Sequence, residues 1–319
     1  AIIGAGISGM GAAWALRNSA DVTVFEKGDR PGGHACTHEF EYDGEAMHVD
    51  LGFIVYNTFN YPNLIALFEA LGVETQPSDM SFSVSDPHGW TWASTLSGIF
   101  AQKRNFFSPS FHRFWRTILR FNDLARAELA SGAIEDRTLG SWLDRHGFSA
   151  EFRDNYILPM GAAIWSTPEQ QMLEYPAHSF FQFFDNHRLM HKERPRWRTV
   201  SGGSQQYVSR LTSELGRRMR LNTPIARIHP FGNKVAVVTA AGSTEIFDDV
   251  ILACHSDEAL GLVENDYEDS AFLLRSIRYR PNTIYLHRDV SLMPSRKSAW
   301  ASWNVLKQSN GDICLTYWM

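Results

Sequence analysis

A glycine pattern near the start of the chain could bind the phosphates of a nucleotide. Gly4, Gly6 and Gly9 follow a short apolar strand and precede a helix predicted over 10–17. In such a pattern the first glycine permits a tight turn, the second lets the backbone approach a pyrophosphate, and the third lets the helix pack close to the strand. The helix start, with Ile7 and Ser8, presents N–H groups and a positive dipole end. The pattern predicts a dinucleotide site, and an ordinary glycine-rich turn is the alternative.

A second group of residues lies where the ribose and the remainder of a dinucleotide would follow. Glu26 and Lys27 end a strand predicted over 21–26, about 20 residues after Gly6, where a carboxylate can accept both hydroxyls of an adenosine ribose. A nicotinamide dehydrogenase needs no further glycine pair beyond this acid, whereas a longer, bent dinucleotide does. The loop that follows contains three candidates for contact with such a longer dinucleotide: Arg30, Gly32 and Gly33.

The whole stretch from Gly4 to His34 resembles the FAD site of the flavin amine oxidase and phytoene desaturase superfamily. The resemblance covers most of the chain and continues at DLGF (50–53), WRTVSGG (197–203) and DVILA (249–253). Within the superfamily the chain is most similar to a bacterial group of FAD-dependent oxidoreductases associated with cyclopropane fatty acyl synthases. The resemblance implies non-covalent FAD, with four further contacts: His34, Gly52, Phe53 and Ile225.

Several of these assignments have a plain structural alternative. Arg30 could neutralise a diphosphate, because phosphate recognition uses the guanidinium fork, or be a solvated loop charge. His34 could contact the flavin or be a polar loop residue. Asp50 could orient the loop into Gly52, and a capping or turn role is equally compatible with its position. Ile225 matches the family position whose backbone meets the adenine, although its side chain alone indicates a strand core.

Aromatic residues are the main candidates for a substrate site. They make up 13% of the chain, and many lie between 95 and 200. Trp300 and Trp303 fall in or beside a strand predicted over 300–304, which the resemblance routes along the cavity in front of the flavin. Core packing is the alternative for both, and for a run of aromatics at nearly helical spacing: Phe106, Phe107, Phe111, Phe114, Trp115 and Phe121.

Composition excludes several classes of protein. The net charge of −5 and the absence of a basic stripe argue against nucleic-acid binding. No apolar run approaches the ~18 residues of a membrane span, although peripheral membrane contact stays compatible with the sequence. Three scattered cysteines argue against a disulfide framework and favour a cytoplasmic protein. The spacing of His178, His187 and His191 does not indicate a metal site, so none is predicted.

The predicted elements give an α/β fold with a discontinuous Rossmann-like FAD-binding domain (1–75 and 200–265). A mainly helical substrate domain with a β-meander (76–199 and 266–319) is inserted into it. The main elements predicted from periodicity are a helix over 62–71, a hairpin over 82–92, helices across 95–170, a helix over 205–219, a meander over 225–254, a helix near 258, and strands over 283–288 and 313–319. Both ends of the sequence predict continuing chain, and the resemblance implies a C-terminal segment that completes the flavin pocket.

These observations predict an FAD-dependent oxidoreductase in which the flavin accepts a hydride from the substrate. The favoured substrate is a small apolar molecule such as an unsaturated or modified fatty acyl chain, changed by desaturation or isomerisation. Amine oxidation is one alternative. A flavin-binding protein without catalysis, acting as partner of a lipid-modifying enzyme, is another. No catalytic residue is assigned.

Overall fold

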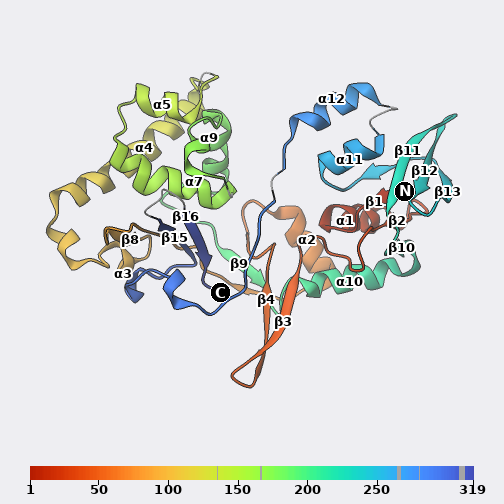
Figure 1. The fold of residues 1–319 in the computed structure, drawn as a ribbon, viewed down its shortest axis with the longest axis horizontal. Helices are drawn as coiled ribbons and strands as arrows, with labels where there is room; N and C mark the ends of the chain where they lie inside the picture. The colour runs from red at the N-terminus through yellow and green to blue at the C-terminus, as the bar shows by residue number, and fades with distance from the viewer. Residues whose placement is uncertain (135, 166, 264–266, 280, 309–312) are drawn as a thin grey trace. The chain divides into compact units, whose positions relative to one another are not determined.

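The computed structural model describes residues 1–134, 136–165, 167–263, 267–279, 281–308 and 313–319 (Figure 1). The chain divides into two compact units. The first comprises Ala1–Val55, Asn63–Gln76 and Thr199–Tyr285, and the second comprises Tyr56–Pro62, Pro77–Arg198 and Leu286–Met319. The described residues from 267 to 285 belong to the first unit, whereas the domain prediction had placed them in the substrate domain. The assignment of the two units as FAD and substrate domains stays a prediction.

The first unit contains the predicted parallel sheet. Its strand order is β10 (Met219–Arg220), β2 (Val24–Phe25), β1 (Ile2–Ile3) and β14 (Ile251–Leu252), with every pairing parallel. Helix α1 (Ile7–Leu16) connects β1 to β2, and α10 (Gln205–Leu215) precedes β10. Helix α10 ends four residues before the predicted 219 because Gly216 leaves helical geometry with φ +53°. Strand, glycine turn and helix therefore follow one another as the sequence predicts.

An antiparallel sheet in the same unit corresponds to most of the predicted meander. It consists of β11 (Ile225–Phe231), β12 (Lys234–Thr239) and β13 (Thr244–Phe247). The fourth predicted strand, β14, pairs with β1 in the parallel sheet, so its place in the meander was wrong. A hairpin of β3 (Thr37–Tyr42) and β4 (Glu45–Asp50) was not predicted. Three helices complete the unit: α2 (Pro62–Leu71, whose Pro62 is counted with the second unit), α11 (Ser256–Val263) and α12 (Glu268–Ser276).

Short strands lie at the points where the sequence changes unit. Strands β5 (Tyr56–Asn57), β9 (Trp197–Val200) and β6 (Thr75–Pro77) form a three-stranded sheet in the order β5-β9-β6. Because each strand is short, no alternating pattern marks it in the sequence, and none of the three was predicted.

The second unit combines a small sheet with the predicted helices. The sheet order is β16 (Ile313–Tyr317), β15 (Trp303–Lys307), β7 (Phe82–Ser85) and β8 (Thr91–Ala93), so the predicted 82–92 hairpin is confirmed. Its helical segments, including the π-helical η2 and the 3₁₀ segments, are α3 (Leu96–Ile99), η1 (Lys103–Phe107), α4 (Pro109–Ser131), α5 (Leu139–Arg145), α6 (Ala150–Phe152), η2 (Arg153–Ile157), α7 (Leu158–Trp165), α8 (Glu169–Met172), α9 (Ala177–Asn186), η4 (Val290–Leu292) and η5 (Lys297–Ala299).

Helix α4 shows why these residues form a helix. Ser108 accepts a hydrogen bond from the Phe111 N–H at its start, Pro109 occupies the first turn, and Gly132 ends it with φ +68°. Its apolar positions recur at helical spacing and are buried in an aromatic core. Three of the aromatics weighed for a lipophilic tunnel, Phe111, Phe114 and Phe121, lie in this core, whereas Phe106 and Phe107 are exposed.

The strand predicted over 283–288 was wrong. Residues 281–289 have no regular secondary structure, and Ile284 and Tyr285 are exposed. Apolar alternation alone does not form a strand, because the backbone groups of a strand need a neighbour that pairs with them. Trp300 also lies outside β15, which begins at Trp303, so the predicted strand over 300–304 is shifted by three residues.

Candidate functional site

The turn between β1 and α1 is built from glycines that exclude side chains. Gly4 has φ +106°, and a Cβ on Gly9 would lie 1.9 Å from the carbonyl oxygen of Gly4. No larger residue therefore fits at Gly9 without separating the helix from the turn. A Cβ on Gly6, by contrast, would have no atom within 4 Å, so the backbone there faces open space. Helix α1 begins at this point with no side chain capping its first N–H groups.

The second glycine pair lies directly beside this turn. The N–H of Gly32 donates to the carbonyl oxygen of Ala5 at 2.8 Å, and Gly32 forms a parallel bridge with Gly6. A Cβ on Gly33 would lie 3.2 Å from the Cα of Gly6. The Arg30 guanidinium is exposed and donates to the carbonyl oxygen of Gly33 at 3.0 Å. The two glycine patterns thus form one backbone surface, which we call the glycine cradle (Gly4–Gly9 and Gly32–Gly33).

The Glu26 carboxylate is held at the edge of the glycine cradle. One oxygen accepts the N–H of Ala5 at 2.8 Å and the other accepts the N–H of Gly28 at 2.8 Å. A carboxylate has about four acceptor positions, so two directions remain available to a pair of hydroxyls. Lys27 is exposed and forms an ion pair with Glu258 on α11, and this hydrogen bond raises the pKa of Lys27.

Ile225 lies on a segment that runs along Glu26. The N–H of Thr223 donates to the carbonyl oxygen of Glu26 at 2.8 Å, and the N–H of Asn222 donates to that of Gly28 at 2.9 Å. Ile225 follows at the start of β11, half-buried and paired with Thr239. The structure therefore brings Ile225 and Glu26 together, although 198 residues lie between them in the sequence.

His34, Gly52 and Phe53 are joined by backbone contacts. The N–H of Phe53 donates to the carbonyl oxygen of His34 at 3.0 Å. A Cβ on Gly52 would lie 2.1 Å from the same oxygen, which explains the glycine. The Phe53 ring meets that of Tyr207 edge to face, with centroids 6.5 Å apart. This contact connects the segment to α10.

Asp50 has the capping role that the sequence left open. Its carboxylate is buried and accepts the N–H of Ser204 at 2.9 Å, the Ser204 hydroxyl at 2.7 Å and the Thr37 hydroxyl at 2.6 Å. A negative charge at a helix N-terminus is stabilised by the helix dipole. Asp50 thereby fixes the start of α10 against β3 and β4, from which the chain enters Gly52 and Phe53.

Two residues near His34 were missed by the sequence analysis. The imidazole of His255 stacks against that of His34, with centroids 5.5 Å apart, and against the Tyr279 ring at 4.2 Å. His255 follows β14, at the carboxyl end of a parallel strand. Ligands of open α/β sheets bind at such ends, and this was the signal that could have identified it.

The two tryptophans proposed for the substrate site differ in their surroundings within the second unit. The Trp303 ring packs on the aromatic core and meets Tyr317 edge to face at 5.0 Å. The Trp300 indole N–H donates to the carbonyl oxygen of Pro294 at 2.8 Å, and its ring meets Trp318 at 5.3 Å. These contacts fix both rings, and their role as substrate lining stays a prediction.

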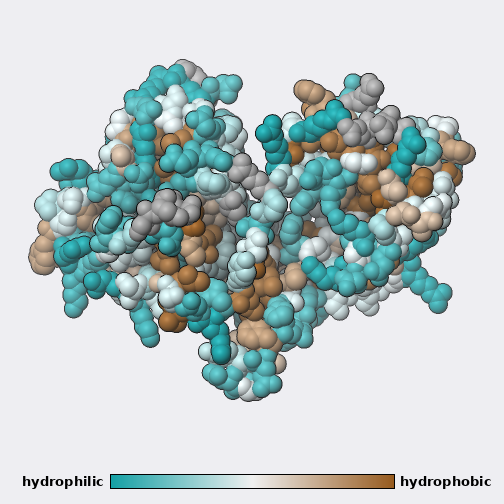
Figure 2. All heavy atoms as spheres, viewed as in Figure 1, coloured by the Kyte–Doolittle hydropathy of each residue, from teal (hydrophilic) through white to brown (hydrophobic). Residues whose placement is uncertain are grey.

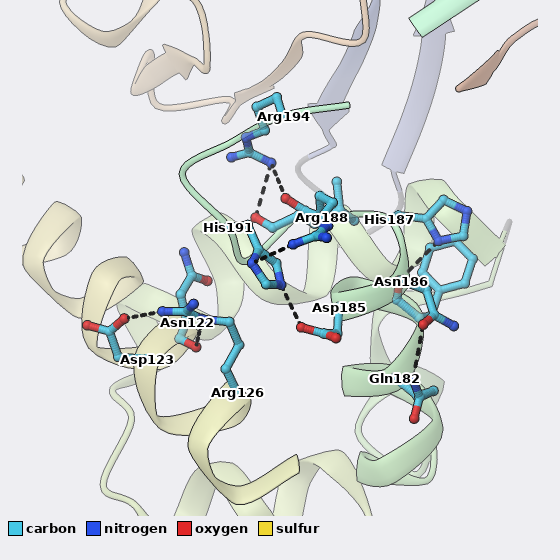
Figure 3. A network of polar contacts seen from close by, with 12 residues as sticks. Asn122, Asp123, Arg126, Gln182, Asp185, Asn186, His187, Arg188, His191 and Arg194 are labelled. Carbon is cyan, nitrogen blue, oxygen red and sulfur yellow. Dashed lines mark hydrogen bonds and ion pairs between the residues drawn. The ribbon is translucent and has the colours of Figure 1, made fainter. Parts of the chain in front are cut away.

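Two of the three histidines weighed as metal ligands, His187 and His191, make polar contacts within the second unit (Figure 3), whereas His178 is exposed. The side chains of His191 and Asp185 form a hydrogen bond with 2.6 Å between Nε2 and Oδ1, and Arg188 also contacts His191. His187 instead stacks on Phe183, with its Nδ1 3.0 Å from that residue's carbonyl oxygen. In the described ranges, no group of three or more His, Cys, Asp or Glu could hold a metal ion.

Comparison with protein families gives a match that covers most of the chain. The family model for flavin containing amine oxidoreductases matches residues 7–283. AofH of Mycobacterium tuberculosis, assigned by its name to the flavin-containing monoamine oxidases, is 26% identical over 260 residues, which are 76% of this chain and 54% of AofH. The chain thus spans about half the length of the curated relatives it matches.

Solved structures share the fold. Cyclohexylamine oxidase from Brevibacterium oxydans has a TM-score of 0.67 and 23% identity, with 86% of this chain and 62% of that chain covered. A CLA-producing fatty acid isomerase from P. acnes has a TM-score of 0.56 and 18% identity, with 82% and 59% covered. The Rossmann-like fold class is confirmed, and the chain belongs to the flavin-containing amine oxidoreductase family.

Proposed function

We propose that the first unit binds FAD without a covalent link and that the protein is an FAD-dependent oxidoreductase. The observation that carries this proposal is the glycine cradle, where open space over Gly6 adjoins an uncapped helix start and an oriented carboxylate. When bound, FAD would supply the hydride-accepting chemistry. The protein would supply binding, orientation and exclusion of water.

Each residue of the proposed site is assigned to one part of FAD by its chemical type. The N–H groups of Ile7 and Ser8 would face the phosphates, and Gly6, Gly32 and Gly33 would let the ligand lie against the backbone. The remaining assignments are Glu26 for the ribose hydroxyls, Ile225 for the adenine, Arg30 for phosphate charge, and His34, Gly52 and Phe53 for the flavin half. Lys27 stays assigned to the cofactor, although Glu258 already pairs with it.

We infer that the substrate is a small lipophilic molecule. The second unit has an aromatic core, and one solved structure with a similar fold is named a fatty acid isomerase. Amine oxidation is the second candidate, because AofH and cyclohexylamine oxidase carry amine oxidase names. A flavin-binding partner of a lipid-modifying enzyme is the non-catalytic alternative.

Cofactor binding is tested by absorption spectra of the purified protein before and after acid precipitation. We expect flavin bands that leave the protein on precipitation and are identified as FAD. Glu26→Gln should lower FAD affinity by one to two orders of magnitude, since hydrogen bonds to charged groups contribute about 1.5–3 kcal/mol. Glu214→Gln, an exposed substitution on α10, is the matched control. Full FAD affinity in Glu26→Gln would contradict the site.

The substrate class is tested by anaerobic reduction of the bound flavin with one panel of acyl lipids and one of amines. Reduction by acyl lipids supports the lipophilic proposal. Reduction by amines alone would overturn it in favour of amine oxidation. A flavin that neither panel reduces, in a protein that still binds FAD, would favour the non-catalytic alternative.

A further inference from the structure

An exposed segment of the second unit, between β8 and α4, combines apolar and basic side chains. Leu96 is 93% exposed, Phe107 83% and Phe106 56%, and Lys103 and Arg104 lie between them and are also exposed. We call these five residues the 96–107 surface. Side chains exposed to this extent add little to the core of the unit. When they are gathered with charges, they mark an interaction surface.

Hydrogen bonds and a ring contact fix the backbone beneath the exposed side chains of the 96–107 surface. Gln102 is buried, and its side-chain oxygen accepts the N–H of Thr91. The N–H of Asn105 donates to the Gln102 carbonyl oxygen at 2.9 Å. The Phe106 ring packs on Phe100, with centroids 5.3 Å apart. The apolar side chains therefore project from a defined geometry.

The sequence around this surface is rich in basic residues. Residues 87–122 contain five Lys and Arg and no Asp or Glu, although the chain as a whole has 35 acidic and 30 basic residues. The segment η5 contacts α3 and adds the exposed cation Lys297, and the exposed Arg296 directly precedes it. Figure 2 shows hydrophobic and hydrophilic atoms interspersed over the part of the second unit where Figure 1 draws α3.

We propose that the 96–107 surface docks the protein on an anionic lipid surface. Leu96, Phe106 and Phe107 enter the boundary between headgroups and acyl chains, while Lys103 and Arg104 pair with lipid phosphates. The Phe106 and Phe107 rings contact each other, with centroids 5.1 Å apart, and a small apolar cluster flanked by cations suits a fluid interface that can close around it. A protein partner instead requires a continuous complementary face of roughly 800 Å². In the described part of the chain no helix combines the length and the apolar character needed to cross a bilayer.

Flotation with phosphatidylcholine vesicles, with and without phosphatidylglycerol, tests the proposal. The protein should float with the anionic vesicles and release as salt is raised. Lys103→Gln with Arg104→Gln should weaken binding roughly 30-fold, because each basic residue near such a surface contributes about fivefold. Phe107→Ser should weaken it about tenfold through lost apolar burial.

Two matched controls separate this surface from general adhesion. Phe231→Ser removes an exposed aromatic from β11, and Lys192→Gln with Arg217→Gln removes two exposed cations elsewhere. Binding should be unchanged in both, and thermal unfolding should be unchanged in all variants. An unaltered protein that ignores anionic vesicles, or controls that lose as much binding as the test variants, would overturn the proposal. So would saturable binding to an acidic protein without any vesicle binding.

Discussion

At the scale of single residues, two glycines of one helix have opposite surroundings. A Cβ on Gly9 would collide with the carbonyl oxygen of Gly4, whereas a Cβ on Gly11 would have nothing within 4 Å. Both lie in α1, so they have the same backbone geometry and differ in what faces them. The close packing of the cradle requires glycine at position 9. At position 11 a side chain would fit, so glycine there only lowers the stability of the helix.

Gly9→Ala and Gly11→Ala should therefore change stability in opposite directions. We expect Gly9→Ala to lower the free energy of unfolding by about 1–3 kcal/mol through overpacking and to reduce flavin content. Gly11→Ala should raise it by up to about 1 kcal/mol, because alanine favours the helix. Urea unfolding and the flavin-to-protein absorbance ratio measure both. Equal behaviour of the two variants would contradict the close packing at Gly9.

His187 gives a second prediction at this scale. Burial lowers the pKa of its imidazole, which stacks on Phe183. A lowered pKa in the folded state means that protonation favours the unfolded chain. The contribution to stability is present above the unfolded value of about 6.5 and is lost as pH falls through the lowered folded pKa.

His187→Gln should then flatten the decline in unfolding free energy below about pH 6.5. His88→Gln, at an exposed turn, is the control substitution. Urea unfolding across this pH range measures the difference. The same slope in the parent protein and His187→Gln would show that the imidazole does not contribute.

At the scale of elements, the position of α10 depends on one carboxylate from β4. Asp50 supplies the acceptor for the Ser204 N–H that the helix itself cannot satisfy, and it also binds the Thr37 hydroxyl of β3. The same strand leads directly into Gly52 and Phe53. Capping and cofactor geometry are therefore coupled through a single buried side chain.

Asp50→Asn should lower the free energy of unfolding by about 1–3 kcal/mol, because an amide nitrogen cannot accept the N–H and hydroxyl donors now bound. Asp257→Asn changes an exposed acid in the first turn of α11 and should cost less than 1 kcal/mol, because the amide oxygen can still accept the Glu258 N–H and only the dipole interaction is weakened. Chemical unfolding compares the two. A smaller effect at Asp50 than at Asp257 would contradict the buried cap.

At the scale of the whole molecule, the chain builds two compact units, and both are discontinuous in sequence. The glycine cradle lies in the first unit, and the largest aromatic core lies in the second. A ligand that binds only the folded first unit stabilises that unit by mass action, by about 2.7 kcal/mol at 100 times its dissociation constant.

FAD should consequently slow amide hydrogen exchange in β1, β2 and β14 more than in α4 and α9. Exchange measured by mass spectrometry, with and without added FAD, resolves these segments. The Gly9→Ala variant is the control, in which added FAD should protect β1 little. Equal protection of both units would contradict a site confined to the first.

The sequence alone determined the cradle and the elements beside it, because these are local. A position that must adopt φ +106°, or that lies against a carbonyl oxygen, requires glycine, so it can be recognised in the sequence, as at Gly4 and Gly9. Helix α4 and the 82–92 hairpin were predictable for the same reason, since their caps, periodicity and turns lie within a few residues. The predicted site residues of the first unit are indeed neighbours in it, although their cofactor roles stay predictions.

Tertiary structure decided what depends on pairing between distant segments. Strand β14 joined β1 instead of the meander, and residues 283–288 formed no strand, because a strand exists only where another backbone pairs with it. The stack of His255 on His34 and the cap of Asp50 on α10 arise in the same way, across gaps of more than 150 residues. The exposure of individual aromatic side chains also depends on tertiary packing. Phe106, Phe107 and Phe111 look alike in the sequence, and only packing buries the third and exposes the first two.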